Sequence, residues 1–407
     1  MPCFYQVGVD LRFAQERFFQ LATIGLLFAS FFIPSRQVQH EWSIKNMTGW
    51  LAGFGIWTIF LYAFNPMQTG TTILVNILNS LLIYNICIRT LKKEDISFIF
   101  KGILFICGLN IIFLASQRLG FDPIFHIRNC SEGSTDLLGF FGLKAAMGMY
   151  FALSMSILAF FTWWLPILFF LPIGLSVSTG AMTAGFISYL FVLWYKKRLA
   201  FWTVSVVGVL AVSTWIIAVD SPMGMFKTRP PMWKIVLQDS FRNMKGHGLD
   251  SFRYGDVRYY LEPKTNKSVR AFRGELTEEA QKTLVTNGQV EDINLTNGNR
   301  VLFKKGHARN VYGMETLEDK VDWWDNPHNE YLHLFYEFGL PGVILIGLVL
   351  YSMAIRFTRT YKTHVLVAVT GAMIALLVAS VTQFPFHLAR IGHIVPILLS
   401  IFFLESE

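Results

Sequence analysis

Apolar and polar stretches alternate along the chain at the scale of a membrane-spanning helix. Apolar runs of roughly 17–21 residues are separated by short polar breaks, the pattern of a chain that crosses a membrane repeatedly. We expect helices near residues 18–34, 47–64, 71–89, 98–116, 145–162, 164–178, 181–195, 200–219, 338–355, 363–382 and 388–404. The pattern therefore predicts an all-α polytopic membrane protein with about 11–12 transmembrane helices.

One hydrophilic segment, residues 220–330, interrupts this pattern. It is too long for a plain connection, so we expect it to have structure of its own. The chain then divides into N-terminal transmembrane helices (1–219), a large loop with the candidate motifs (220–337) and C-terminal transmembrane helices (338–407).

Composition supports the membrane assignment. The chain of 407 residues is 53% hydrophobic and 15% charged, whereas a soluble domain carries about 25% charged residues. Four cysteines, Cys3, Cys87, Cys107 and Cys130, show no spacing typical of a metal site or a disulfide framework.

Short basic loops predict the orientation. Three such loops cover residues 89–95, 195–198 and 356–362. Basic loops remain on the cytoplasmic side, which puts the large loop on the outer side. Counting helices back leaves the N-terminus outside as well, which fits Arg12 and Arg17 poorly.

The stretch WDNPHNEYLHLFYEFGLPG, residues 324–342, begins with turn-forming residues and ends inside an apolar run. Asn326 can cap a helix and Pro327 suits its first position. We then expect His328 and Asn329 in the first turn, where the positive end of the helix dipole disfavours a protonated imidazole. A neutral imidazole is what a general base requires.

Two carboxylates accompany this histidine. Glu330 suits the same helix start, and Glu337 lies two turns further on, on the same face. We hypothesise that His328 is a base, with Glu330 or Glu337 orienting it. The alternative is an ordinary helix start at the membrane surface, with His328 and Asn329 as cap and anchor.

A second polar motif lies in the stretch KTRPPMWKIVLQDSFRNMKGHGLDSF, residues 227–252. We expect a helix to open at Pro230-Pro231, and GHGLDSF to form a tight turn after it. Arg229 beside a helix start suits a phosphate group, because guanidinium and free N–H groups both donate to it. The alternative is that Arg229 anchors a lipid headgroup.

Several motifs are absent from the sequence. It has no paired carboxylates for a divalent ion, no glycine-rich phosphate loop and no G-x-S-x-G. No metal and no cofactor is therefore expected. Lys101 is the clearest charge inside a predicted helix, and ion-coupled transporters usually need several.

The spacing of His328-Asn329, nine residues, Gly339, two residues and Gly342 resembles the signature of the O-antigen ligase and polymerase family of bacterial inner-membrane glycosyltransferases. Arg229 and Trp233 followed by GHGLDSF are similar to that family too. So is the layout, with one large loop before the last helices.

The resemblance implies metal-independent transfer of a glycan from undecaprenyl pyrophosphate to an acceptor hydroxyl on the periplasmic face. It assigns His328 as base and Arg229 as a pyrophosphate ligand. Family members often have Ser-Arg-Gly where this chain has Ser178-Thr179-Gly180. Basic residues that could replace the missing arginine are Lys144, Lys245, Arg253 and Arg390.

The expected function is therefore that of an O-antigen ligase, which joins the glycan to lipid A-core in lipopolysaccharide biosynthesis by an inverting reaction. We expect Arg229, Asn329, Lys245, Arg253 and Arg390 to bind substrate, membrane lipid to be a partner, and no nucleic acid to bind. The alternatives are a polysaccharide polymerase, a protein-glycosylating member of the family, or, in a different class, a transporter of lipid-linked sugar.

Overall fold

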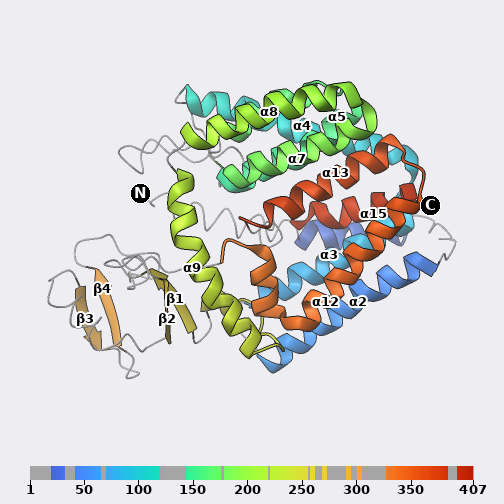
Figure 1. Cartoon of the computed structure of the whole chain (residues 1–407). Coiled ribbons are helices and arrows are strands. Elements are labelled where there is room, and N and C mark those ends of the chain that lie inside the picture. Colours follow the sequence, from blue (N-terminus) through green and yellow to red (C-terminus); the bar gives the residue numbers. More distant parts are fainter. Residues whose placement is uncertain are drawn as a thin grey trace.

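The computed structural model describes residues 20–32, 42–65, 70–119, 121, 144–175, 178–218, 221–254, 257–261, 268–272, 290–294, 300–304, 327–383 and 392–406. This part of the chain is mostly helical, as predicted (Figure 1). After a helical run at residues 20–30, the helices before the large loop are α2 (Trp42–Phe64), α3 (Gly70–Thr90), α4 (Lys93–Arg118), α5 (Lys144–Phe161), η3 (Leu165–Phe169), α6 (Phe170–Leu175), α7 (Thr179–Lys196) and α8 (Arg198–Ala218). The later helices are α9 (Ser221–Arg242), α10 (Ser251–Tyr254), α12 (Glu330–Arg359), α13 (His364–Ala379) and α15 (Ile394–Ser406).

The large hydrophilic segment has structure of its own, as expected. Strands β1 (Val257–Leu261) and β2 (Ser268–Phe272) form one antiparallel hairpin, and β3 (Val290–Asn294) and β4 (Arg300–Lys304) form another. Valine, tyrosine and phenylalanine in these strands favour extended backbone. The described strands therefore all belong to the predicted loop region.

Four described helices are long and apolar enough to cross a membrane: α2 from Met47 onward, α3, α4 and α12. Their length and composition suggest a membrane protein. Outward-facing apolar side chains on α8, such as Leu199 and Trp202, are largely exposed, as lipid-facing residues are. The total of about 11–12 spans remains a prediction.

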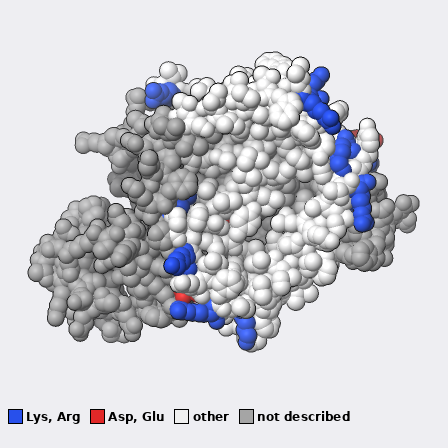
Figure 2. Space-filling view, viewed as in Figure 1, with Lys and Arg blue, Asp and Glu red and all other residues white. Residues whose placement is uncertain are grey.

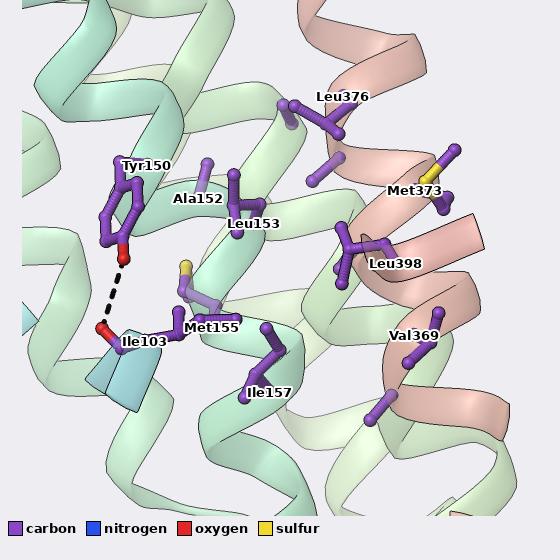
Figure 3. Close-up of a cluster of buried hydrophobic side chains, with 14 of the residues drawn as sticks. Ile103, Tyr150, Ala152, Leu153, Met155, Ile157, Val369, Met373, Leu376 and Leu398 are labelled. Carbon is purple, nitrogen blue, oxygen red and sulfur yellow. Dashed lines mark hydrogen bonds between the residues drawn. The ribbon is translucent and has the colours of Figure 1, made fainter. Parts of the chain in front are cut away.

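The centre of the bundle is formed by α5, α7 and α13, which pack against one another. Figure 3 shows part of this core, where Leu153 and Ile157 of α5 lie across from Val369 and Leu376 of α13. The phenol of Tyr150 donates to the carbonyl of Ile103 at 3.3 Å and ties α5 to α4. These three helices form a framework on which the peripheral helices pack.

The predicted helix at 164–178 is wrong as a continuous element. The structure has the short 3₁₀ helix η3 followed by the six-residue helix α6. Pro166 and Pro172 explain the break, because each proline removes one backbone donor and restricts the residue before it.

The three basic loops lie at one end of the bundle. Tyr195, near the end of α7, packs on Phe357 near the end of α12 with ring centroids 5.7 Å apart. Arg356 lies over the ring of Phe403 at 5.4 Å, and Ser400 donates to the carbonyl of Tyr84 in α3. In Figure 2, Lys and Arg gather at separate edges of the molecule, with a broad surface of other residues between them.

Candidate functional site

The predicted site forms at the other end of the bundle, where α12 begins. The helix starts at Glu330, and Asn329 caps it because its Oδ1 accepts from the backbone N–H of Leu332 at 3.1 Å. The prediction that Asn326 caps a helix with His328 in its first turn is therefore wrong, since His328 precedes the helix; Asn326 itself lies outside the described residues. His328 has a left-handed backbone with φ of 46°.

His328 is half-buried, and the positive charge of Arg229 acts on it. Burial lowers the pKa of His328 to about 3, with further contributions from the nearby Arg229 and His333. Its imidazole is thus neutral at physiological pH. The neutral form was predicted from the helix dipole, whereas burial is the first cause of the lowered pKa and the charge of Arg229 the second.

Arg229 reaches this site from α9. It is buried, and its Nη1 donates to the carbonyl of Thr382 at 2.9 Å. Burial lowers the pKa of Arg229 below its ordinary value, though a guanidinium remains charged near neutral pH. One turn along, the indole Nε1 of Trp233 donates to the carbonyl of Pro327 at 2.6 Å. These two bonds attach α9 to the end of α13 and to the residue before His328.

The predicted helix start at Pro230-Pro231 is wrong. Helix α9 begins at Ser221, so Arg229 lies within it and not beside its N-terminus. Proline fixes φ near the helical value, so the chain continues through both prolines while losing their N–H donors. Any anion at Arg229 is therefore held by the guanidinium and not by free N–H groups of this helix.

Thr382 also contacts the segment where an arginine was expected. A side chain at Gly180 would collide with the hydroxyl of Thr382 and lie 3.3 Å from Cγ of Gln383. Thr179 is thus the neighbour of a residue packed on Thr382, whose carbonyl holds Arg229. Thr382 therefore contacts both Gly180 and Arg229.

Sequence reasoning missed His333, which pairs with Glu337. His333 Nε2 lies 3.1 Å from Glu337 Oε1, and both side chains are buried. The same oxygen accepts a long bond of 3.5 Å from the backbone N–H of Phe252. The spacing of four residues within HLFYE was the signal available for this pair. The hypothesis that Glu330 or Glu337 orients His328 stays a prediction.

Glu330 is also buried, and its backbone N–H donates to the carbonyl of Ser380 at 2.8 Å. This bond joins the start of α12 to the end of α13. It places Glu330 beside the segment of residues 380–383 that holds Arg229.

Helix α12 is broken at Gly339. The residue has φ of 67° and ψ of −172°, so residues 330–338 and 340–359 are two helical pieces. The break leaves backbone groups outside the helical ladder, and other elements bind them. Trp57 Nε1 of α2 donates to the carbonyl of Phe338 at 2.7 Å, and Leu340 N–H donates to the carbonyl of Met244 at 2.8 Å.

GHGLDSF forms a tight turn, as predicted, and the turn binds the backbone of α12 beside its break. Gly246 and Gly248 have φ of 91° and 100°, which favours glycine. His247 N–H donates to the carbonyl of Tyr336 and Gly248 N–H to that of Glu337, at 2.9 and 3.1 Å. The turn thereby fixes the last residues before the break.

Of the remaining predicted binding residues, the structure describes the side chain of Lys245 alone. Lys245 lines an open, apolar cleft of about 520 Å³ with Met244, Leu340, Pro341, Ile344 and Leu345. The side chains of Lys144, Arg253 and Arg390 lie outside the described part of the chain.

No protein-family model matches the chain, and no curated protein matches it.

Proposed function

We propose that this protein is an O-antigen ligase-like glycosyltransferase. It transfers a glycan from undecaprenyl pyrophosphate to a hydroxyl of lipid A-core. The observation that carries the proposal is a half-buried His328, kept neutral by burial and by the charge of Arg229, whose buried guanidinium comes from a separate helix. The imidazole of His328 suits the removal of a proton from an acceptor hydroxyl, and the guanidinium of Arg229 suits the binding of a diphosphate.

The chemistry follows from these two groups. The acceptor oxygen attacks the anomeric carbon, and the bond from that carbon to the diphosphate oxygen breaks with its electron pair. Arg229 stabilises the negative charge that develops on the leaving diphosphate. His328 removes the proton from the acceptor as the new bond forms. Attack from the face opposite the diphosphate inverts the anomeric centre.

The two ends of the bundle support the proposed location. The basic loops lie at one end, and the candidate site lies where α12 begins, at the other. Because basic loops stay in the cytoplasm, the site faces the periplasm in a bacterial inner membrane.

The test is a transfer assay with the full chain in detergent. Wild type, His328→Gln and Arg229→Lys receive undecaprenyl-pyrophosphate-linked glycan and lipid A-core, with EDTA present. We expect glycan on the core with wild type and a loss of about 10²–10⁴-fold with His328→Gln, the range for removing a general base. His364→Gln, at the basic end of α13, is the matched control and keeps full activity.

Other outcomes identify the alternatives. Full activity of His328→Gln would contradict the base assignment. Longer lipid-linked chains in place of modified core would identify a polymerase. Movement of lipid-linked glycan between bilayer leaflets, without a new glycosidic bond, would identify a transporter.

A further inference from the structure

The C-terminal half of α9 presents apolar side chains to the outside of the molecule. Leu237 and Phe241 are one helical turn apart, so they lie on the same side of the helix, and Met244 follows in the turn. All three side chains are exposed, Phe241 by 56%. A contiguous exposed apolar surface marks a contact site for protein, ligand or membrane.

Basic side chains accompany these apolar ones. Among the described side chains of residues 233–245, the exposed ionisable groups are Lys234, Arg242 and Lys245, all of them basic. Figure 2 shows Lys and Arg atoms over the region where α9 lies in Figure 1. The buried carboxylate of Asp239 lies 3.5 Å from Nη1 of Arg242. The Arg242 side chain is nevertheless 71% exposed, and a guanidinium has five N–H donors, so one such contact leaves donors for an anion.

The end of α9 lies where the second piece of α12 begins. Leu340 N–H donates to the carbonyl of Met244 at 2.8 Å, and residues 340–359 belong to a helix long and apolar enough to cross a membrane. Leu340 and Ile344 are exposed on that helix. The apolar side chains at the end of α9 therefore adjoin the outer surface of a candidate span.

An open, apolar cleft of about 520 Å³ lies at this junction. Its lining residues are Met244, Lys245, Leu340, Pro341, Ile344 and Leu345. Lys245 adds a cation to the cleft, and Arg242 precedes it by less than one helical turn. An apolar cleft beside two exposed cations is complementary to a molecule that carries both a hydrocarbon chain and an anionic headgroup.

We propose that this cleft, with Arg242 and Lys245, binds an anionic phospholipid of the surrounding bilayer. The acyl chain lies against the apolar lining at residues 340–345, and the headgroup phosphate accepts hydrogen bonds from the guanidinium and the ammonium. This inference goes beyond the proposed transfer reaction and does not depend on it.

The position of the cations separates this lipid from the glycan donor of the proposed reaction. Arg229, which we propose to bind the diphosphate of the donor, lies in the same helix as Arg242. A helix rises 1.5 Å per residue, so the two arginines are about 20 Å apart along α9. One diphosphate cannot contact both. Arg242 and Lys245 therefore suit the headgroup of a different lipid.

The experiment is photolabelling of the full chain in nanodiscs. One sample contains phosphatidylglycerol with a diazirine on its acyl chain, and a parallel sample contains phosphatidylcholine with the same chain. Labelled residues are mapped by mass spectrometry and normalised to the labelling of Leu199 and Trp202 on the exposed face of α8. We expect phosphatidylglycerol to label Met244 and Leu340 about fivefold more than phosphatidylcholine does, the factor for one basic residue near an anionic lipid surface.

Two variants test the headgroup and the chain separately. Combining Arg242→Gln with Lys245→Gln should reduce labelling by phosphatidylglycerol to the level of phosphatidylcholine. Ile344→Trp fills the cleft and should reduce labelling of Met244 by both lipids. Lys234→Gln is the matched control: it removes an exposed cation of α9 about 12 Å along the helix from Arg242, and it should keep the wild-type labelling.

The remaining outcomes overturn the inference. Equal labelling by the two lipids in wild type, or unchanged labelling when both cations are replaced, would show ordinary bulk lipid at the cleft. Displacement of phosphatidylglycerol by an equal concentration of undecaprenyl pyrophosphate would assign the cleft to the glycan donor. Displacement by inorganic phosphate would show a site for a free anion. None of these measurements uses transfer activity, so failure of this inference leaves the proposed function to its own test.

Discussion

Gly246 and Gly339 pack against each other through their backbones. A side chain on Gly246 would lie 2.7 Å from the backbone nitrogen of Gly339, and one on Gly339 would lie 2.5 Å from the backbone nitrogen of Gly246. Both residues have positive φ. The turn after α9 and the break in α12 are therefore one joint, and Glu337 lies within it.

Replacing Gly339 by alanine should damage this joint. Strained backbone of this kind costs about 1–3 kcal/mol, and the new Cβ meets backbone atoms that cannot rotate away. We expect Gly339→Ala to lower the thermal unfolding midpoint in detergent and to reduce transfer. Gly347→Ala is the control in the same helix, because a Cβ there meets nothing within 4 Å. Equal unfolding midpoints for the two variants would contradict the claim that the contact between Gly246 and Gly339 stabilises the protein.

Trp233→Phe removes the donor that holds the carbonyl of Pro327. The loss of one such bond costs about 1 kcal/mol in stability. Because Pro327 immediately precedes His328, we expect a larger fall in kcat than the small loss of stability would give. Trp202→Phe, on the exposed face of α8, serves as the matched control. Unchanged kcat in Trp233→Phe would show that the indole does not position His328.

Asn329 allows capping to be separated from substrate binding. Its side chain caps α12, and loss of a cap costs about 1 kcal/mol. Asn329→Ser keeps a capping oxygen, so its stability should match wild type, whereas Asn329→Ala should be less stable. If Asn329 also binds substrate, Asn329→Ser raises KM without lowering the unfolding midpoint. A wild-type KM in Asn329→Ser would show that Asn329 caps the helix and does not bind substrate.

The lowered pKa of His328 makes stability depend on pH. Its pKa is about 3 in the fold and near 6.5 when exposed, so between these values the unfolded chain binds a proton that the folded chain does not. Stability from this source is present above pH 6.5 and falls as the pH is lowered toward 3.

We therefore expect the unfolding midpoint of wild type to drop more steeply between pH 7 and 4 than that of His328→Gln. Midpoints measured across this range test the difference, with His364→Gln as a control that keeps the wild-type slope. Parallel curves for wild type and His328→Gln would show that His328 titrates normally in the fold.

Much of the helical architecture could be predicted, because long apolar runs leave few alternatives to a helix. The connection between α5 and α7 could not, since its prolines lie inside an apolar run that reads as continuous. The start of α12 was misplaced for a different reason. Asn326 and Asn329 can both cap a helix, and the hydrogen bond from Trp233 to the carbonyl of Pro327 accompanies the use of Asn329.

The site was partly predictable. His328 and Arg229 are polar residues in conspicuous motifs, and bonds from α9 to Pro327 and Thr382 bring Arg229 toward the segment around His328. His333 was overlooked because a lone histidine in an apolar helix is unremarkable until Glu337 is seen beside it. Lys245 was expected to bind substrate, but it lines an apolar cleft. Its position depends on how the turn folds over α12, and the spacing of residues in the sequence does not predict that fold.

The break at Gly339 also divides α12 into two pieces that contact different parts of the molecule. Residues 340–359 form the longer piece of a candidate span, whereas residues 330–338 are bonded to the turn, to α2 and to the end of α13. A spanning helix changes its tilt as bilayer thickness changes. Because residues on both sides of Gly339 are held by hydrogen bonds to other elements, we expect transfer by the proposed enzyme to depend little on the thickness of the bilayer.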